Sequence, residues 1–114
     1  MFKQYITFIL IGLSTSVFAQ NVEFKSSNFK DKKEEFKKAE DAISKGDEFF
    51  KVAKEAFFLV QSPGTNYQKA LKQYEVAQKL NPNCGELNFK IGACHANSSN
   101  PLKSINFIKT AKKL

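Results

Sequence analysis

The sequence predicts an all-α fold: helix–turn–helix units that stack into a short α-solenoid, preceded by one long helix. Three observations predict it. Apolar residues recur at spacings of three and four, no segment after residue 19 alternates with the period of a strand, and one pattern returns after 34 residues. That pattern reads small, large, small and is formed by Ala70, Tyr74 and Ala77, then by Ser104, Ile108 and Ala111. Such a period is typical of stacked helical units, which bury their apolar faces only against neighbours.

The first 19 residues are predicted to be a cleavable signal peptide. Lys3 gives a basic start, residues 5–13 are almost wholly apolar, and small residues precede a cleavage site between Ala19 and Gln20. The apolar run is shorter than the roughly 20 residues of a membrane-spanning helix, and no cysteine follows it to carry a lipid. A retained membrane anchor is the alternative. We therefore expect an exported protein, periplasmic or associated with the outer membrane, with no transmembrane segment after signal removal.

Residues 20–28 are predicted to form an extended lead-in, in which Ser26–Asn28 offer helix caps. The apolar register then continues without a slip from Phe29 to about Gln61, which predicts one long helix, or two coaxial helices that meet at Gly46. One row of this register is large and the other mostly small, which suits close packing against another helix. The rows are Phe29, Phe36, Ile43, Phe50 and Phe57, and Ala39, Gly46, Ala53 and Val60.

A Pro63-Gly64 turn separates the long helix from three shorter ones. We expect these at 67–80, capped by Asn66 and closed by Pro82, at about 86–96, and from Pro101 onwards. Residues 29–114 would thus form a single helical domain. Because the period places the next closing proline beyond Leu114, we expect a repeat array truncated at its C-terminal end. A complete small protein that docks its open end on a partner is the alternative.

The composition favours binding over catalysis. The net charge is +7, and every positive charge in it is carried by lysine. The absence of arginine argues against sequence-specific nucleic-acid recognition. Lysines and acidic residues alternate along 30–41, which is typical of a solvated helix face. With a single histidine and no glycine-rich loop, the sequence offers no catalytic, cofactor-binding or metal site. We therefore expect a protein that is not an enzyme.

The two cysteines are not expected to form a disulfide. Cys84 and Cys94 would lie at opposite ends of one helix, on the order of 12–15 Å apart between Cα atoms, whereas a disulfide needs less than about 7 Å. We expect Cys94 to be a core residue and Cys84 to lie exposed in a loop. His95 is interpreted as a partly buried packing residue.

The repeated pattern resembles the tetratricopeptide repeat, a helix–turn–helix family. The matching positions in the second unit are Asn88, Ile91, Gly92, His95, Ser104 and Ile108, and the preceding unit supplies Ala70, Tyr74, Ala77 and Pro82. Asn88 and His95 stand where the family has Trp and Tyr. The stretch from Asn81 to Cys94 also resembles the N-terminal repeat segment of exported proteins of the outer-membrane protein A (OmpA) family. That resemblance implies association with outer-membrane or peptidoglycan-linked assemblies, and in some members with gliding motility or type IX secretion.

In the repeat family, the first helix of each unit lines a concave groove that takes a peptide or a partner helix. Carried onto this chain, the resemblance implies groove contacts at Glu86, Phe89, Ala93 and Asn97. The family's lysine and asparagine that clamp a terminal carboxylate would fall at Phe89 and Ala93, which disfavours carboxylate capture. We thus expect a protein-interaction module, a scaffold or adaptor of the bacterial cell envelope. The alternative is a freestanding secreted basic helical protein that binds anionic surfaces.

Overall fold

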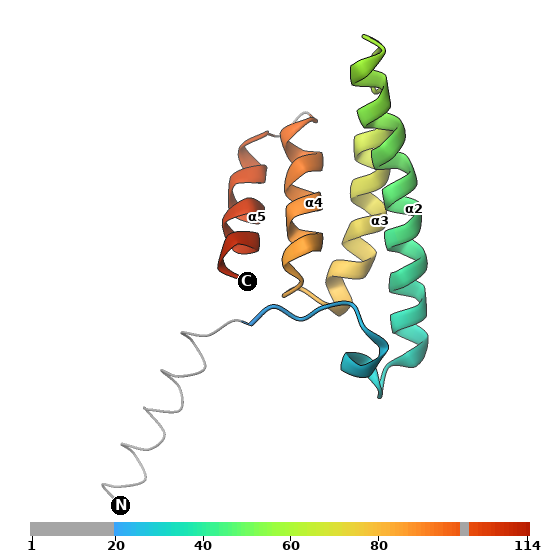
Figure 1. The fold of residues 1–114 in the computed structure, drawn as a ribbon, viewed down its shortest axis with the longest axis vertical. Helices are drawn as coiled ribbons and strands as arrows, with labels where there is room; N and C mark the ends of the chain where they lie inside the picture. The colour runs from blue at the N-terminus through green and yellow to red at the C-terminus, as the bar shows by residue number, and fades with distance from the viewer. Residues whose placement is uncertain (1–19, 99–100) are drawn as a thin grey trace, which may run out of the picture.

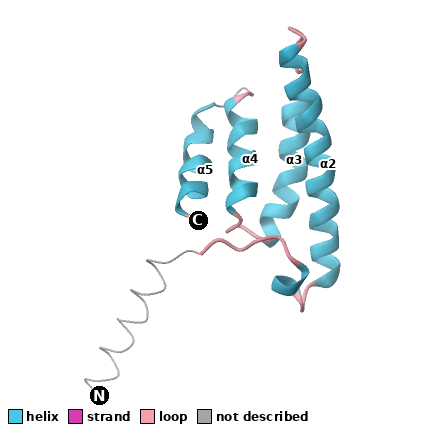
Figure 2. Ribbon diagram, viewed as in Figure 1, coloured by secondary structure: helices cyan, strands magenta, loops and turns pink. Residues whose placement is uncertain are grey.

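A computed structural model describes residues 20–98 and 101–114, and within them the fold is all-helical, as predicted, without strands. The predicted signal peptide, including Ala19, lies outside the described residues. A short 3-10 helix precedes four α-helices (Figures 1 and 2). The elements are η1 (Ser26–Phe29), α2 (Lys33–Phe58), α3 (Asn66–Leu80), α4 (Gly85–Ala96) and α5 (Pro101–Lys113).

The helices form two antiparallel hairpins that stand side by side (Figure 1). The α2–α3 pair and the α4–α5 pair each pack along their length, and α3 joins the hairpins through a smaller contact with α4. The core lies between α2, α3 and α4. Its fully or nearly fully buried members are Ala39, Ala53, Tyr67, Ala70, Tyr74, Ala77, Cys84, Leu87, Ile91 and Cys94.

The long helix α2 passes through Gly46 without interruption, so the one-helix prediction is confirmed. It begins at Lys33 rather than at Phe29, and its N-cap residue Lys32 makes no side-chain capping bond. The prediction of caps at Ser26–Asn28 was wrong, because these residues start η1. There Phe29 stacks on Phe36, with ring centroids 5.5 Å apart, and this contact holds the chain in a turn before α2 starts.

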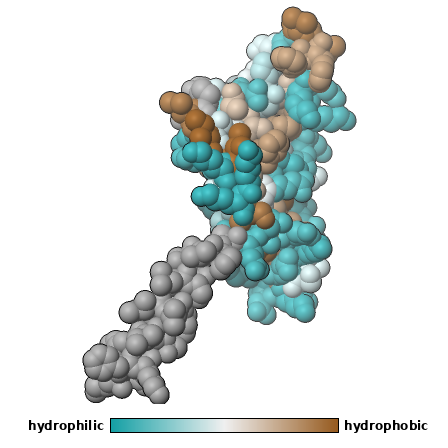
Figure 3. All heavy atoms as spheres, turned by 60° about the vertical axis from the view of Figure 1, so that its left-hand side comes forward, coloured by the Kyte–Doolittle hydropathy of each residue, from teal (hydrophilic) through white to brown (hydrophobic). Residues whose placement is uncertain are grey.

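The end of α2 differs from the predicted register. Phe57 and Val60, placed in the two apolar rows, are 76% and 95% exposed. Their burial fails because α3 starts beside Phe50, whose ring packs edge-on against Tyr67 at 5.8 Å, so α2 extends beyond its partner helix. The exposed end is the brown cluster at the top of Figure 3. The prediction of an Asn66 cap was also wrong: Asn66 is the first residue of α3, and its side-chain amide donates to the Pro63 carbonyl at 3.0 Å.

The lead-in ties the N-terminal segment to the turn between α3 and α4. The Val22 N–H donates to the Asn83 carbonyl at 2.9 Å, and the Asn81 side-chain amide donates to the Val22 carbonyl at 2.6 Å. The Gly85 N–H donates to the Asn21 side chain at 2.8 Å. Cys84, expected to be exposed in this turn, is only 6% exposed, because the lead-in packs across it.

Candidate functional site

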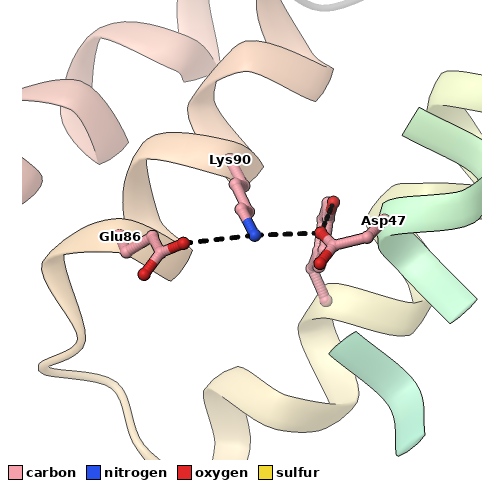
Figure 4. Close-up of polar contacts among 4 residues, drawn as sticks. Asp47, Glu86 and Lys90 are labelled. Carbon is pink, nitrogen blue, oxygen red and sulfur yellow. Dashed lines mark hydrogen bonds and ion pairs between the residues drawn. The ribbon is translucent and has the colours of Figure 1, made fainter. Parts of the chain in front are cut away.

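Three helices meet at one carboxylate, that of Asp47 in α2. The Tyr74 hydroxyl of α3 donates to Oδ1 of Asp47 at 2.6 Å, and Lys90 Nζ of α4 donates to the same oxygen at 2.9 Å. Lys90 also pairs with Glu86 Oε1, one turn earlier in α4, at 3.4 Å (Figure 4). Its ammonium lies 5.9 Å from the centre of the Tyr74 ring. Asp47 therefore links α2 to both α3 and α4.

The electrostatics of this cluster hold its protons in place. Burial raises the pKa of the Tyr74 phenol, and the hydrogen bond to Asp47 raises it further. Burial lowers the pKa of Lys90, but the hydrogen bond and charge of Asp47, together with Glu86, outweigh it, and the pKa is raised overall. Tyr74 thus remains a neutral donor and Lys90 a cation at physiological pH. In this state Asp47 accepts from a neutral phenol and from a charged ammonium at the same time.

Lys90 also separates two cavities between α2 and α4. The first, which we name the α2–α4 groove, has a volume of about 420 Å³ and lies toward the exposed end of α2. Its lining residues are Asp47, Phe50, Lys51, Lys54, Glu55, Phe58 and Lys90. The second, about 340 Å³, lies under the lead-in and is lined by Asn21, Glu23, Phe24, Lys25, Ile43, Cys84, Glu86, Leu87 and Lys90.

The groove residues implied by the resemblance are only partly brought to these cavities. Glu86 lines the cavity under the lead-in, whereas Phe89, Ala93 and Asn97 line neither cavity. Phe89 is 57% exposed. Lys90, and not Phe89, lines both cavities, because adjacent residues of a helix point about 100° apart. The helical spacing of Glu86 and Lys90 was the one sequence signal for this cluster. Asp47 gave none, since its partners lie far along the chain.

The residues predicted to pack within the repeats differ in how deeply they are buried. Ala70, Tyr74, Ala77 and Ile91 are fully buried and Gly92 is buried, whereas Pro82 is exposed in the α3–α4 turn. In α5, Ser104 is 7% exposed, and Ile108 and Ala111 are half-buried, because α5 packs mainly on α4.

Two residues of α4 that depart from the repeat pattern have specific partners. Asn88 is buried, and its side-chain amide donates to the carbonyls of Pro82 and Cys84, both at 2.9 Å. His95 is 6% exposed, and its ring stacks on Phe107 with centroids 5.3 Å apart. Burial lowers the pKa of His95, and the nearby charge of Lys103 lowers it further. His95 is therefore a neutral packing residue at pH 7.

Among the described residues, the two cysteines are shielded from solvent and no metal-holding cluster is present. Cys84 and Cys94 are free and buried, and burial raises the pKa of the Cys94 thiol to about 12. Across residues 20–98 and 101–114, no three His, Cys, Asp or Glu side chains are grouped so as to hold a metal ion. None of the helices in these ranges combines the length and apolar character that membrane crossing requires.

Protein-family models, curated protein sequences and solved structures were compared with the chain, and none of them matches it.

Proposed function

We propose that this chain is an exported protein-interaction module, a scaffold or adaptor of the bacterial cell envelope, that binds a partner segment in the α2–α4 groove. The observation that carries the proposal is the groove itself, an open hollow of about 420 Å³ that combines phenyl rings with lysines along α2 and is bounded on the α4 side by Lys90. Recognition sites commonly combine an apolar surface with a few placed polar groups.

The charges of the groove favour an acidic and apolar partner segment. Lys90 and Asp47 neutralise each other, which leaves Lys51 and Lys54 opposite a single carboxylate, that of Glu55. Lys54 lies over the Phe50 ring at 5.4 Å from its centre, so one surface offers both a cation and an aromatic face. Carboxylate side chains of a partner would pair with the lysines while its apolar side chains cover the rings.

The chain's own lead-in supports this mode of binding. Its extended residues lie at the neighbouring cavity, where Phe24 lines the space between Ile43 of α2 and Leu87 of α4. Main-chain hydrogen bonds at Val22 hold the segment there. The pair of helices therefore already accommodates one extended segment beside the open groove.

A repeat origin of the two hairpins is part of the proposal. In each hairpin a glycine of the first helix lies against a large side chain of the second: Gly46 against Tyr74, and Gly92 against Ile108. Such close helix contacts fit the tetratricopeptide resemblance, which we extend to a role like that of the repeat segment of OmpA-family proteins. Export rests on the signal-like first 19 residues.

The groove is tested with peptides selected by phage display on the folded protein. Selected sequences are expected to combine acidic with aromatic or aliphatic residues. Binding measured by fluorescence polarisation should weaken about tenfold or more in the double variant Lys51→Glu and Lys54→Glu, because partner carboxylates would then meet like charges.

The matched control is the double variant Lys109→Glu and Lys112→Glu, which makes the same charge change at the same spacing on α5 and should leave binding unchanged. Equal weakening by both pairs would show a general charge effect and reject the groove. Export is tested by N-terminal sequencing of the protein from the periplasmic fraction, which should start at Gln20. A retained Met1 would reject cleavage.

A further inference from the structure

The end of α2 carries the most exposed apolar surface in the described part of the chain. We call it the apolar tip and define it as residues 57–60. Phe57, Phe58, Leu59 and Val60 are 76%, 79%, 66% and 95% exposed. Figure 3 shows this cluster at the top of the molecule, beyond the body formed by the other helices. A contiguous exposed apolar patch of this kind marks an interaction surface.

At the apolar tip, Val60 has a left-handed backbone conformation that is unfavourable for a β-branched residue. The Gln61 N–H donates to the Ala56 carbonyl at 2.8 Å and the Val60 N–H to the Phe57 carbonyl at 3.2 Å, the bonding pattern of a Schellman helix end. This pattern requires a left-handed residue, usually glycine. Here it is Val60, with φ +54°, although a β-branched residue is unfavourable in that conformation. The Val60 side chain remains 95% exposed, so burial does not offset this strain.

The geometry points to a membrane surface containing anionic lipids as what the apolar tip binds. Phe57 and Phe58 lie in the last turn of α2, with their rings packed edge-on at 5.8 Å, whereas Leu59 and Val60 lie in the turn that ends the helix, so the four side chains do not share one helical face. A flat protein face would cover only part of them. The interfacial region of a bilayer can surround all of them at once, and aromatic and aliphatic side chains insert there by burying apolar area.

The charges around the tip agree with this choice. Residues 56–68 carry no charge, so nothing ionic would enter the apolar layer. Lys51 and Lys54 lie one to two turns behind the tip on α2, and Lys69 lies over the Phe49 ring, 5.7 Å from its centre. Between residues 51 and 69, Glu55 is the single acidic residue. Lysines in that position reach the headgroup level while the tip enters the bilayer.

The apolar tip shares Phe58 with the proposed partner groove, and the lysines behind the tip, Lys51 and Lys54, also line that groove. The test therefore leaves these three residues unchanged. It uses the chain that starts at Gln20, which retains every described residue, because the apolar run 5–13 would itself bind lipid. Binding is measured by cosedimentation with vesicles of equal parts phosphatidylcholine and phosphatidylglycerol, and with vesicles of phosphatidylcholine alone.

We expect binding to the mixed vesicles that is weaker on phosphatidylcholine alone. The double variant Phe57→Ser and Leu59→Ser should bind about tenfold more weakly, since it removes two apolar side chains from the bilayer. Val60→Gly should weaken binding roughly two- to fivefold while its thermal midpoint rises by roughly a few degrees, because it relieves the left-handed valine. Weaker vesicle binding together with a higher thermal midpoint would show that Val60 contributes to membrane binding and not to the stability of the fold.

The matched control is the double variant Leu102→Ser and Ile105→Ser, which removes exposed apolar side chains from α5 and should bind vesicles as the parent chain does. Absence of binding to the mixed vesicles would overturn the inference. So would binding that Phe57→Ser and Leu59→Ser leave unchanged, which would reflect the lysines alone. A dimer in sedimentation velocity that dissociates in this tip variant would show instead that the tip contacts a second copy of the chain.

Discussion

The ring of Tyr74 closes directly over Gly46. A Cβ atom built on Gly46 would lie 2.6 Å from Cε1 of that ring, far inside van der Waals contact. The same ring carries the hydroxyl that donates to Asp47, one residue after the glycine. The absence of a side chain at position 46 therefore lets α3 approach α2 closely enough for the Tyr74–Asp47 hydrogen bond to form. That bond in turn positions the carboxylate for Lys90 of α4.

Gly46→Ala should destabilise the fold, although alanine is the better helix former by about 1 kcal/mol. The methyl group would displace the buried Tyr74 ring, and overpacking of this kind costs about 1–3 kcal/mol. Urea unfolding followed by circular dichroism measures the change. Gly85→Ala is the control, because its Cβ would meet its nearest atoms only at 3.4 Å. A Gly46→Ala protein as stable as the parent would contradict this packing.

Asp47 and Tyr74 should be energetically coupled. Tyr74→Phe removes one hydrogen bond and should cost about 0.5–1.5 kcal/mol, and Asp47→Ala should cost about 1–3 kcal/mol because it leaves the Tyr74 hydroxyl and Lys90 without their partner. In a double-mutant cycle, the coupling should lie at about 0.5 kcal/mol or above. Strictly additive losses would mean that the 2.6 Å contact contributes nothing.

Glu86→Ala provides the comparison within the same cluster. The Glu86 side chain is 79% exposed and pairs with Lys90 over 3.4 Å, so solvent screens the interaction. Its removal should change the free energy of unfolding by less than about 0.5 kcal/mol. A loss of stability as large as that of Asp47→Ala would show that Asp47 is not the main partner of Lys90.

His95 should make the fold sensitive to mild acid. Burial, and then the charge of Lys103, lower its pKa in the folded state, while Glu75 acts in the opposite sense. A lowered folded pKa contributes stability that is present above the unfolded value near 6.5 and is lost as pH falls through the folded value. The urea midpoint should therefore drop between pH 7 and pH 5.5.

In His95→Phe, which keeps an aromatic ring against Phe107, this component of the pH dependence should disappear. The informative quantity is the difference between the two proteins over that pH range, since both share the same carboxylates. Parallel curves would show that His95 does not titrate with folding.

The two thiols should be protected in the native protein. Cys84 is 6% exposed and Cys94 fully buried, and the Cys94 pKa of about 12 keeps it protonated, whereas the thiolate is the reactive form. Ellman's reagent at pH 8 should react with both thiols in urea and only slowly without it. A reductant should leave the thermal midpoint unchanged. Fast labelling of one thiol in Cys94→Ala would identify Cys84 as exposed.

The helices themselves could be predicted, because they follow from local spacing. The three-four register carried α2 through Gly46 and Pro101 began α5, both as the structure has them, whereas α2 ends at Phe58 and not at about Gln61, before the Pro63-Gly64 turn is reached. The ends of α2 could not be placed. At its start, the Phe29–Phe36 stack holds the chain in a turn, and at its end the register continues past the point where a partner helix is present.

The site was harder to predict than the helices. The resemblance placed the groove contact at Phe89, whereas the structure places the adjacent Lys90 there, since helix rotation relative to neighbours decides which of two adjacent residues faces a cavity. Asp47 bonds to residues 27 and 43 positions away, a relationship with no local signature. Cys84 was expected to be exposed because the sequence did not show that the lead-in returns across the α3–α4 turn.

The sequence by itself determined an all-helical chain with small and large residues on facing rows, because apolar periodicity and turn residues act over a few positions. Only the tertiary structure decided that Tyr74 covers Gly46, that Asp47 joins three helices, and that the end of α2 remains uncovered. These relationships depend on where helices stop relative to one another and on how each is rotated. Packing across the whole chain sets both quantities, and no short stretch of sequence contains them.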